Sequence, residues 1–502
     1  MNNSKKSIYN ILFGLLSQLI TIVAGVIFPR LILINLGSEI NGLTNSVNQI
    51  FVYFSLLEAG VGTASLQALY GPVGRMEYDS INGILAATDR YYKRTGCIYV
   101  ISFVGLSILY PLLVDSTLPR STIFWVIIFT GLSGVISYFF QGKYNILLLA
   151  EGKNYINSNL GSIVYIITSI LKLWLLISGY GIVAIQGMYC AFNFVKMLYI
   201  EWYMRTKYKW INLKVNPNIG AISQSKFAFI HQLSSLIFNN TDIIILTFFV
   251  GLKSVSVYSM YTLLFGMIGT AIATITSSVQ FALGQVFDNN RKKYIEYHDA
   301  YEVFSMVVCF SLYCVANIFI LPFMKLYTSG VDDIVYVDKY LPYLFVIVFL
   351  ISNARESSNI TIKYAGHFKQ TVSRTIIEST INIIVSILCV WKFGIYGVLF
   401  GTIVALLYRA NDMIIYSSKR ILEISPWKTY RRWCRNLLVF VLITVVAKNI
   451  SMDLSSYFDI ICYACATALV CVSSFVIVNM LFEKKVLNIL VHILFHKFKK
   501  SN

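Results

Sequence analysis

The stretch "FNNTDIIILTFFVG", residues 238–251, is an apolar run of membrane character that carries Asn239, Asn240, Thr241 and Asp242 in a row. A carboxylate in hydrocarbon is costly, so such a residue either faces protein or serves a function. Which of these applies depends on whether the chain around the stretch lies in a membrane.

The composition is that of an integral membrane protein. The chain has 502 residues, of which 57% are hydrophobic and 13% charged, and its mean hydropathy is +0.69. A soluble protein carries roughly 25% charged residues. Most of this chain is therefore predicted to lie in the bilayer.

Hydropathy windows predict about fourteen transmembrane helices, since a spanning helix needs about 20 apolar residues. The predicted spans are 8–34, 41–69, 92–114, 121–150, 158–178, 181–203, 226–250, 255–285, 301–324, 340–363, 372–392, 394–417, 435–450 and 459–482.

The basic residues predict the orientation, because cytoplasmic loops are enriched in Lys and Arg. Most of the 41 Lys and Arg residues fall in the segments that lie on the same side as the two termini, including "RRWCR" at 431–435. We therefore expect a multi-pass protein of the bacterial cytoplasmic (inner) membrane with both termini in the cytoplasm. The net charge of +18 then indicates a collar facing anionic membrane lipids, not nucleic-acid binding.

An internal repeat appears when the sequence is shifted by 214 residues. Four landmarks coincide under this one shift: "SQL" at 17–19 with "HQL" at 231–233, Gly37 with Gly251, Gly152 with Gly366, and Gly187 with Gly401. Each copy holds six predicted helices, an even number, so both copies have the same orientation in the membrane. This is the parallel type of repeat that transporters use.

The predicted fold is thus an all-α polytopic membrane protein with two six-helix bundles and two extra C-terminal helices. The expected domains are an N-terminal bundle at 1–203, a cytoplasmic linker at 204–225, a C-terminal bundle at 226–418, and a basic loop, helices 13 and 14 and a tail at 419–502. The polar run at 239–242 corresponds to "GVIF" at 25–28, just before Pro29 and Arg30. Both repeats therefore interrupt their first helix at one depth, where it would line a central cleft.

The charged residues inside the predicted spans include Arg30, Glu58, Lys172, Lys196, Asp242, Arg355, Glu356, Glu378, Arg409 and Asp412. A charge at the bilayer centre costs roughly 2.5–3.5 kcal/mol, so these side chains should face protein or water. Helical spacing favours intrahelical ion pairs for Arg374–Glu378 and Arg409–Asp412. It also places Arg355, Asn359 and Lys363 on one helix face.

Arg30, Lys172 and Arg355 are the strongest candidates for a functional role, because cations in mid-membrane are rare unless they serve a function. Asp242 and Glu58 are candidates for their counter-ions or for a proton or sodium site. No phosphate-binding Gly-rich loop, metalloprotease motif or catalytic triad accompanies them. We therefore expect neither enzymatic activity nor a metal or other cofactor.

The chain resembles the polysaccharide flippase family, the Wzx-type lipid-linked oligosaccharide translocases of the multidrug/oligosaccharidyl-lipid/polysaccharide exporter superfamily. The resemblance covers residues 8–482 and is carried by "FPRLILINLGSEINGL" (28–43), "LLEAGVG" (56–62), "NNTDIIILTFFVGLKSVSVYS" (239–259) and "GIYGVLFGT" (394–402).

The resemblance implies a flippase that moves undecaprenyl-pyrophosphate-linked sugar repeats to the outer leaflet by alternating access, for O-antigen, capsule or exopolysaccharide. It implies a cationic cavity, here Arg30, Lys172, Arg355 and Arg409, with Glu58, Asp242, Glu356 and Asp412 as acidic positions for ion coupling or charge balance. Further partners it implies are a polymerase and a chain-length regulator of the same pathway. Arginine suits a pyrophosphate because it can hold two oxygens at once.

Two other classes stay open at this point. A multidrug or small-cation exporter of the same architecture should favour acidic cavities, since cations repel one another. A membrane enzyme such as a polysaccharide polymerase should show a large outer loop or an aspartate-rich metal site. The cations in the spans favour the flippase. The sequence does not choose among a proton gradient, a sodium gradient and the membrane potential as the driving force.

Overall fold

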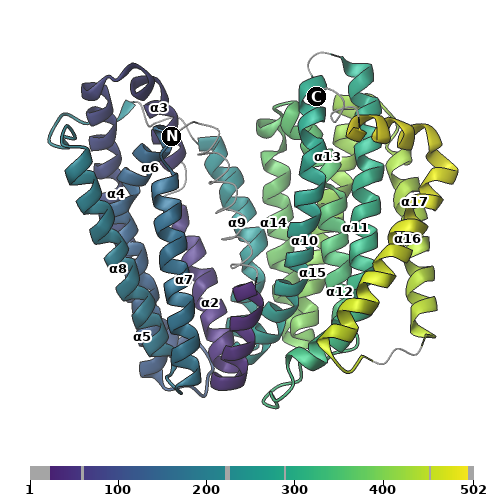
Figure 1. Cartoon of the computed structure of the whole chain (residues 1–502), viewed down its shortest axis with the longest axis horizontal. Coiled ribbons are helices and arrows are strands. Elements are labelled where there is room, and N and C mark those ends of the chain that lie inside the picture. Colours follow the sequence, from purple (N-terminus) through teal and green to yellow (C-terminus); the bar gives the residue numbers. More distant parts are fainter. Residues whose placement is uncertain (1–22, 58–60, 221–225, 288–289, 451–453, 496–502) are drawn as a thin grey trace. The chain divides into compact units, whose positions relative to one another are not determined.

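The computed structural model describes residues 23–57, 61–220, 226–287, 290–450 and 454–495, and nearly all of them are helical (Figure 1). Within these residues, each of the fourteen predicted spans lies on helix to within a residue or two at its ends. Residues 8–22 of the first predicted span lie outside the described residues. In the part of the chain that the structure describes, nine helices are long and apolar enough to cross a membrane, and Val23–Leu36 and Leu236–Phe249 are shorter apolar helices. The all-helical prediction is confirmed.

The chain forms two compact units, Met1–Ser256 and Val257–Asn502. Besides the helix Val23–Leu36, the elements of the first unit are α2 (Ser38–Phe54), η1 (Ser55–Leu57), α3 (Val61–Arg75), α4 (Tyr78–Leu113), α5 (Arg120–Ile136), η2 (Ser137–Gln141), α6 (Gly142–Ala150), α7 (Tyr155–Ile177), α8 (Ile182–Lys207) and α9 (Lys226–Phe249). The division between the units falls inside α10 (Leu252–Phe287). The domain limits expected from the sequence stay predictions.

The second unit is organised around α11 (Arg291–Tyr327), which packs against α12, α16 and α17. The remaining elements are α12 (Leu341–Ala354), α13 (Glu356–Tyr364), α14 (Phe368–Phe393), α15 (Ile395–Tyr416), η4 (Ser417–Leu422), α16 (Trp427–Lys448) and α17 (Tyr457–Phe495). Helices α14 and α15 form the most extensive helix pair of this unit. Gly397 and Gly401 permit it, because a Cβ atom at either position would lie within 2.5 Å of residues on α14.

Left-handed glycines mark equivalent points of the two repeats. Gly37 and Gly251 have φ angles of 86° and 105°, and Gly152 and Gly366 both have φ of 67°. Only glycine adopts this region without steric cost. The shift of 214 residues found in the sequence therefore corresponds to the same backbone conformation at both pairs of helix ends.

The repeats also interrupt one helix at matching positions. In the first unit the π-helical turn η2 separates α5 from α6 and ends at Gln141. In the second unit α12 and α13 are separated at Arg355, which is the residue that the 214-residue shift aligns with Gln141. Breaks of this kind are frequent at functional sites and, in transporters, at binding sites.

The segment after α8, expected to be a cytoplasmic linker, is attached to the first unit through residue 218. The backbone amide of Asn218 donates to the carbonyl of Gly83 over 2.9 Å, and the rings of Trp210 and Tyr78 lie 4.6 Å apart. Both Tyr78 and Gly83 belong to the first turns of α4. Residues 221–225 lie outside the described part.

A carboxylate in the loop before α12 stabilises the start of that helix. Asp338 accepts hydrogen bonds from the Tyr396 hydroxyl at 2.5 Å and from the Tyr340 and Leu341 amides at 2.8 and 3.2 Å. Burial opposes the charged carboxylate, but these hydrogen bonds outweigh it and hold the pKa of Asp338 below its usual range.

Replacing Asp338 with asparagine should therefore lower the free energy of unfolding at pH 7 by about 1 kcal/mol. Because the pKa is lowered on folding, this contribution is present above the pKa of the unfolded state and is lost as the pH falls through the lower, folded-state pKa. Thermal unfolding of the two proteins at pH 7 and near pH 3 measures the difference. The exposed Asp332→Asn change in the same loop is the control, and an equal loss there would contradict the argument.

Candidate functional site

Five charged side chains form a continuous network in the second unit. Nη1 of Arg355 lies 2.6 Å from Oε1 of Glu378, whose other oxygen lies 3.4 Å from Nε of Arg409. Arg409 in turn donates to Asp412 over 2.7 Å, and Asp412 also accepts from Arg374 over 2.7 Å. We call these five residues the arginine network. In this network Glu378 joins Arg355 to Arg409, and Asp412 joins Arg409 to Arg374.

Two helices and one helix break hold the arginine network in place. Arg355 lies at the break between α12 and α13, Arg374 and Glu378 lie on α14, and Arg409 and Asp412 lie on α15. The predicted pair within α15 is confirmed. The predicted pair within α14 is wrong: Arg374 binds Asp412 on the neighbouring helix, and Glu378 binds the arginines of the break and of α15.

The arginine network has an excess of one positive charge, since three arginines face two carboxylates. Its interior is desolvated, because the side chains of Arg409 and Glu378 are only 4% and 5% exposed. Arg374 and Arg355 are 31% and 15% exposed, so solvent or a ligand can reach them. Buried cations attract anions strongly because water does not screen them.

An aromatic extension continues the network from Arg374. Its guanidinium lies 4.4 Å from the centre of the Tyr416 ring, and the Tyr416 hydroxyl lies 3.0 Å from Nδ1 of His367. A guanidinium stacked on a ring keeps its outer donors free for a planar or tetrahedral anion.

Glu356 belongs to a separate pair. It accepts from the Asn359 amide at 2.8 Å and lies 3.4 Å from Nζ of Lys363. Arg355, Asn359 and Lys363, which were predicted to share one helix face, have different partners: Arg355 contacts Glu378 on α14, whereas Asn359 and Lys363 contact Glu356.

In the first unit, Lys172 on α7 lies among aromatic rings. Its Nζ atom is 4.6 Å from the ring centre of Phe28 and 5.9 Å from that of Tyr189. No carboxylate of the described residues lies within ion-pair distance of it. Arg30 follows Phe28 by two residues on the helix Val23–Leu36 and is partly buried.

The polar run of α9 lies against α2 of the same unit. The hydroxyls of Tyr53 and Thr241 are 2.7 Å apart, and Thr247 donates to Ser46 over 2.7 Å. Asp242 is 5% exposed. Part of the run thus serves helix packing, while the role of Asp242 in ion coupling stays a prediction. Glu58 lies outside the described residues.

A second ion cluster was missed by the sequence analysis. Arg432 on α16, 1% exposed, contacts Asp299 and Glu302 on α11 and Glu483 on α17. Lys428 and Arg435 complete this group of three cations and three carboxylates, which we call the α16 cluster. The stretch "RRWCR" at 431–435 was predicted to face anionic lipids on the cytoplasmic side, but Arg432 within it is buried. Lys428, Arg432 and Arg435 follow one helix face at i, i+4 and i+7, and that spacing was a usable signal.

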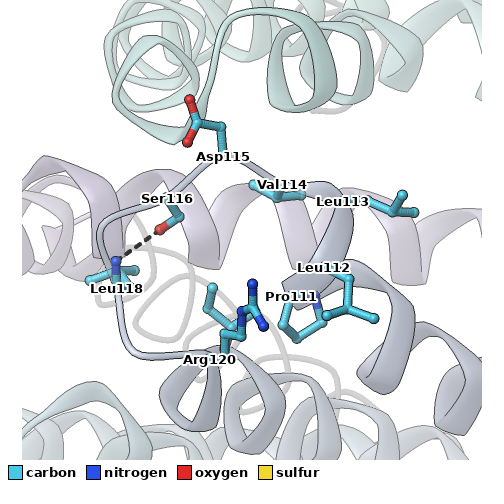
Figure 2. A pocket seen from close by; sticks show the side chains of 9 residues that line it. Pro111, Leu112, Leu113, Val114, Asp115, Ser116, Leu118 and Arg120 are labelled. Carbon is cyan, nitrogen blue, oxygen red and sulfur yellow. Dashed lines mark hydrogen bonds between the residues drawn. The ribbon is translucent and has the colours of Figure 1, made fainter.

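A hollow of about 400 Å³ lies at the turn between α4 and α5 (Figure 2). Pro111, Asp115 and Arg120 are among its lining residues, and Oγ of Ser116 accepts from the Leu118 amide over 3.1 Å. None of the eight candidate residues lines it. Across the described ranges, no group of three or more His, Cys, Asp or Glu residues could hold a metal ion.

Comparison with solved structures relates this architecture to known transporters. The chain superposes on "Lipid II flippase MurJ, inward closed conformation" with a TM-score of 0.72, covering 95% of this chain and 99% of that one at 13% identity. It superposes on an inward-facing multidrug resistance MATE family transporter of the MOP superfamily with a TM-score of 0.60, covering 80% and 95% at 14% identity. The chain has the fold of the MOP-superfamily transporters.

No protein-family model and no curated protein matches the sequence. The MOP fold, together with nine long apolar helices in the described residues, makes the chain an integral membrane protein. Both solved structures are named as transporters or flippases and neither as an enzyme.

Proposed function

We propose that the protein is a flippase for lipid-linked oligosaccharides, which moves undecaprenyl-pyrophosphate-linked repeat units from the inner to the outer leaflet of the bacterial cytoplasmic membrane. The observation that carries the proposal is the excess positive charge of the arginine network, which three arginines and two carboxylates produce in a desolvated site. A pyrophosphate is the complementary anion.

The arginine network supports this proposal better than a cation exporter. A small organic cation would have to approach Arg355 and Arg374, and like charges at close range cost several kcal/mol. Lys172 adds a further cation without a carboxylate neighbour among the described residues. Its two aromatic neighbours supply the apolar and stacking surface that a sugar or a prenyl chain requires.

In the proposed cycle, Arg355 and Arg374 bind the pyrophosphate because they are the exposed members of the network. Arg409 contacts both carboxylates from the buried side and holds them in position. A dianion that binds Arg355 or Arg374 competes with Glu378 or Asp412 for that arginine. The ion pairs can therefore rearrange while the five charged side chains of the network stay the same. The break at Arg355 gives α12 and α13 a place to move separately.

The decisive experiment uses cells in which this gene alone is switched off. We expect a complete polyprenyl-pyrophosphate oligosaccharide to accumulate in lipid extracts, measured by mass spectrometry, with loss of surface polymer. Staining for unpolymerised repeats outside the cell separates a flippase from a polymerase defect. If no such lipid accumulates and the cells instead become sensitive to cationic dyes, the multidrug exporter is the better assignment, which the MATE fold match favours.

Replacing Arg355 with glutamine should reduce export about tenfold or more, because a charge-assisted hydrogen bond contributes about 1.5–3 kcal/mol. Lys172→Gln should act in the same direction. Lys392→Gln on α14 is the matched control, since it removes an exposed cation outside the network. Export is measured as surface polymer at equal protein level and equal melting temperature. Normal export by both variants would remove these residues from the mechanism.

The same proposal places the protein in the inner membrane with both termini in the cytoplasm. It also assigns the protein to an O-antigen or capsule pathway, where it contacts a polymerase and a chain-length regulator. Cysteine labelling from either side of the membrane tests the topology. Cys434, on exposed α16 surface near the predicted cytoplasmic end, should react only with reagents that reach the cytoplasm.

A further inference from the structure

His298 is a buried titratable group that neither the arginine network nor helix packing uses. It lies near the N-terminus of α11 and is 4% exposed. Neither ring nitrogen makes a hydrogen bond of acceptable geometry with a described residue. Leaving a buried polar atom unsatisfied costs about 1–3 kcal/mol, so such groups in native structures call for an explanation.

Charged groups surround this ring from two helices. Tyr294, Asp299 and Glu302 lie on α11 itself, and the ring of Tyr294 is 6.2 Å from that of His298. Helix α16 contributes Arg432, which joins these two carboxylates to the rest of the α16 cluster. The three cations and three carboxylates of the α16 cluster balance. A proton on His298 would therefore give this region a net positive charge.

Each carboxylate of the α16 cluster already binds a cation. Asp299 lies between Lys428 and Arg432, and Glu302 accepts from both Arg432 and the Thr429 hydroxyl. Histidine is the side chain whose charge changes most readily near neutral pH, and neither ring nitrogen of His298 is held by a hydrogen bond with a described residue. His298 is the group of this region that can take up a proton without first breaking an ion pair.

The ring also contacts the helix that starts at the arginine network. The backbone of Ser357 lies beside His298, and the Ser357 hydroxyl is itself buried without a partner among the described residues. Ser357 is the second residue of α13, and Arg355 is the N-cap of that helix. Only Glu356 therefore separates Ser357, the neighbour of His298, from Arg355 along the chain.

We propose that His298 is a proton-binding site through which a proton gradient drives the transport cycle, an inference that rests on the proposed flippase function. An imidazolium has two donors and needs two acceptors. Glu302, one turn along α11, and the Ser357 carbonyl are within its reach. Protonation then draws Glu302 away from Arg432 and draws the start of α13 towards α11, which moves Arg355 relative to Glu378.

The test uses the full chain in liposomes, with the oligosaccharide lipid extracted from cells lacking the gene as the probe. Valinomycin and equal potassium hold the membrane potential at zero while the pH differs by one unit across the membrane. If one proton accompanies each lipid, the equilibrium distribution between leaflets should shift about tenfold for the wild type. His298→Gln should abolish this shift, whereas His492→Gln, which changes a histidine outside both ion networks, should retain it.

Proton binding is measured separately, by NMR of 13C-labelled histidine in a variant whose other four histidines are replaced by glutamine. The remaining signal should titrate between pH 5 and 8.5, and its midpoint should move when Arg355→Gln is added. This measurement does not depend on the folding of a His298 variant. A signal that does not titrate would overturn the proposal, as would a His298→Gln protein that keeps the wild-type pH response.

The two proposals fail in different ways. If the wild type does not move the lipid under any gradient, the flippase function is wrong, and the NMR titration still decides whether His298 binds a proton. If the wild type moves the lipid equally at every pH difference but responds to an imposed potential or to sodium, the flippase stands and the role of His298 is wrong.

Discussion

Replacing Arg432 with methionine should leave little folded protein in the membrane. The guanidinium contacts Asp299, Glu302 and Glu483 and is almost completely buried. Without it, three carboxylates share Lys428 and Arg435. Breaking a buried ion network by removing one partner costs about 3–5 kcal/mol, a large part of the roughly 5–15 kcal/mol that stabilises a native domain. Size-exclusion chromatography of the detergent extract, with the melting temperature, measures the loss.

The neighbouring residue provides a matched control. Arg431 is exposed on the same helix, so Arg431→Met should change the melting temperature little. A second variant separates charge from shape: Arg432→Met combined with Glu302→Leu removes one charge of each sign and should recover part of the stability. If Arg431→Met and Arg432→Met behave alike, the α16 cluster does not stabilise the attachment of α16 and α17 to α11.

Adding a side chain at Gly42 should be comparably harmful, for a steric reason. A Cβ atom at this position of α2 would lie 1.8 Å from the carbonyl oxygen of Leu252, the first residue of α10. Backbone atoms cannot move aside as a flexible side chain can, so α2 would have to separate from that turn. Overpacking costs about 1–3 kcal/mol and sometimes more.

The Gly42→Val variant should therefore extract as aggregate, or melt well below the wild type. Gly105→Ala on α4 is the control, because no atom lies within 4 Å of the added carbon there. Separation of α2 would also weaken the Asn41–Ser256 hydrogen bond, which is 2.7 Å long. A Gly42→Val protein with unchanged melting temperature would show that this contact is looser than described.

Sequence reasoning predicted the helices well because hydrocarbon imposes one strong constraint on length and polarity. It predicted the positions of the repeat because glycines with φ > 0 cannot be exchanged for other residues. It predicted the short-range pair Arg409–Asp412, which depends on spacing within one helix. These three successes depend on local chain properties or on the bilayer alone.

The partners across helices could not be predicted in the same way. Arg374 has a suitable carboxylate four residues away on its own helix, yet it binds Asp412 on α15. The choice depends on how closely α14 and α15 approach, which Gly397 and Gly401 determine. Likewise, a run of basic residues at a helix end resembles a lipid-facing collar, and only the position of α11 and α17 shows that Arg432 faces inward. The roles assigned to Arg30, Lys172, Asp242 and Glu58 stay predictions.

The left-handed glycines have a consequence for detecting remote ancestry. The two halves of this chain share few side chains, so a residue-by-residue comparison of the halves is close to noise. The sign of φ at Gly37 and Gly251, and again at Gly152 and Gly366, is the same at one constant separation. Glycine and its positive φ are thus kept together at both pairs of positions. Aligning distant members of duplicated membrane folds on such glycines first would give a register before any other side chain is compared.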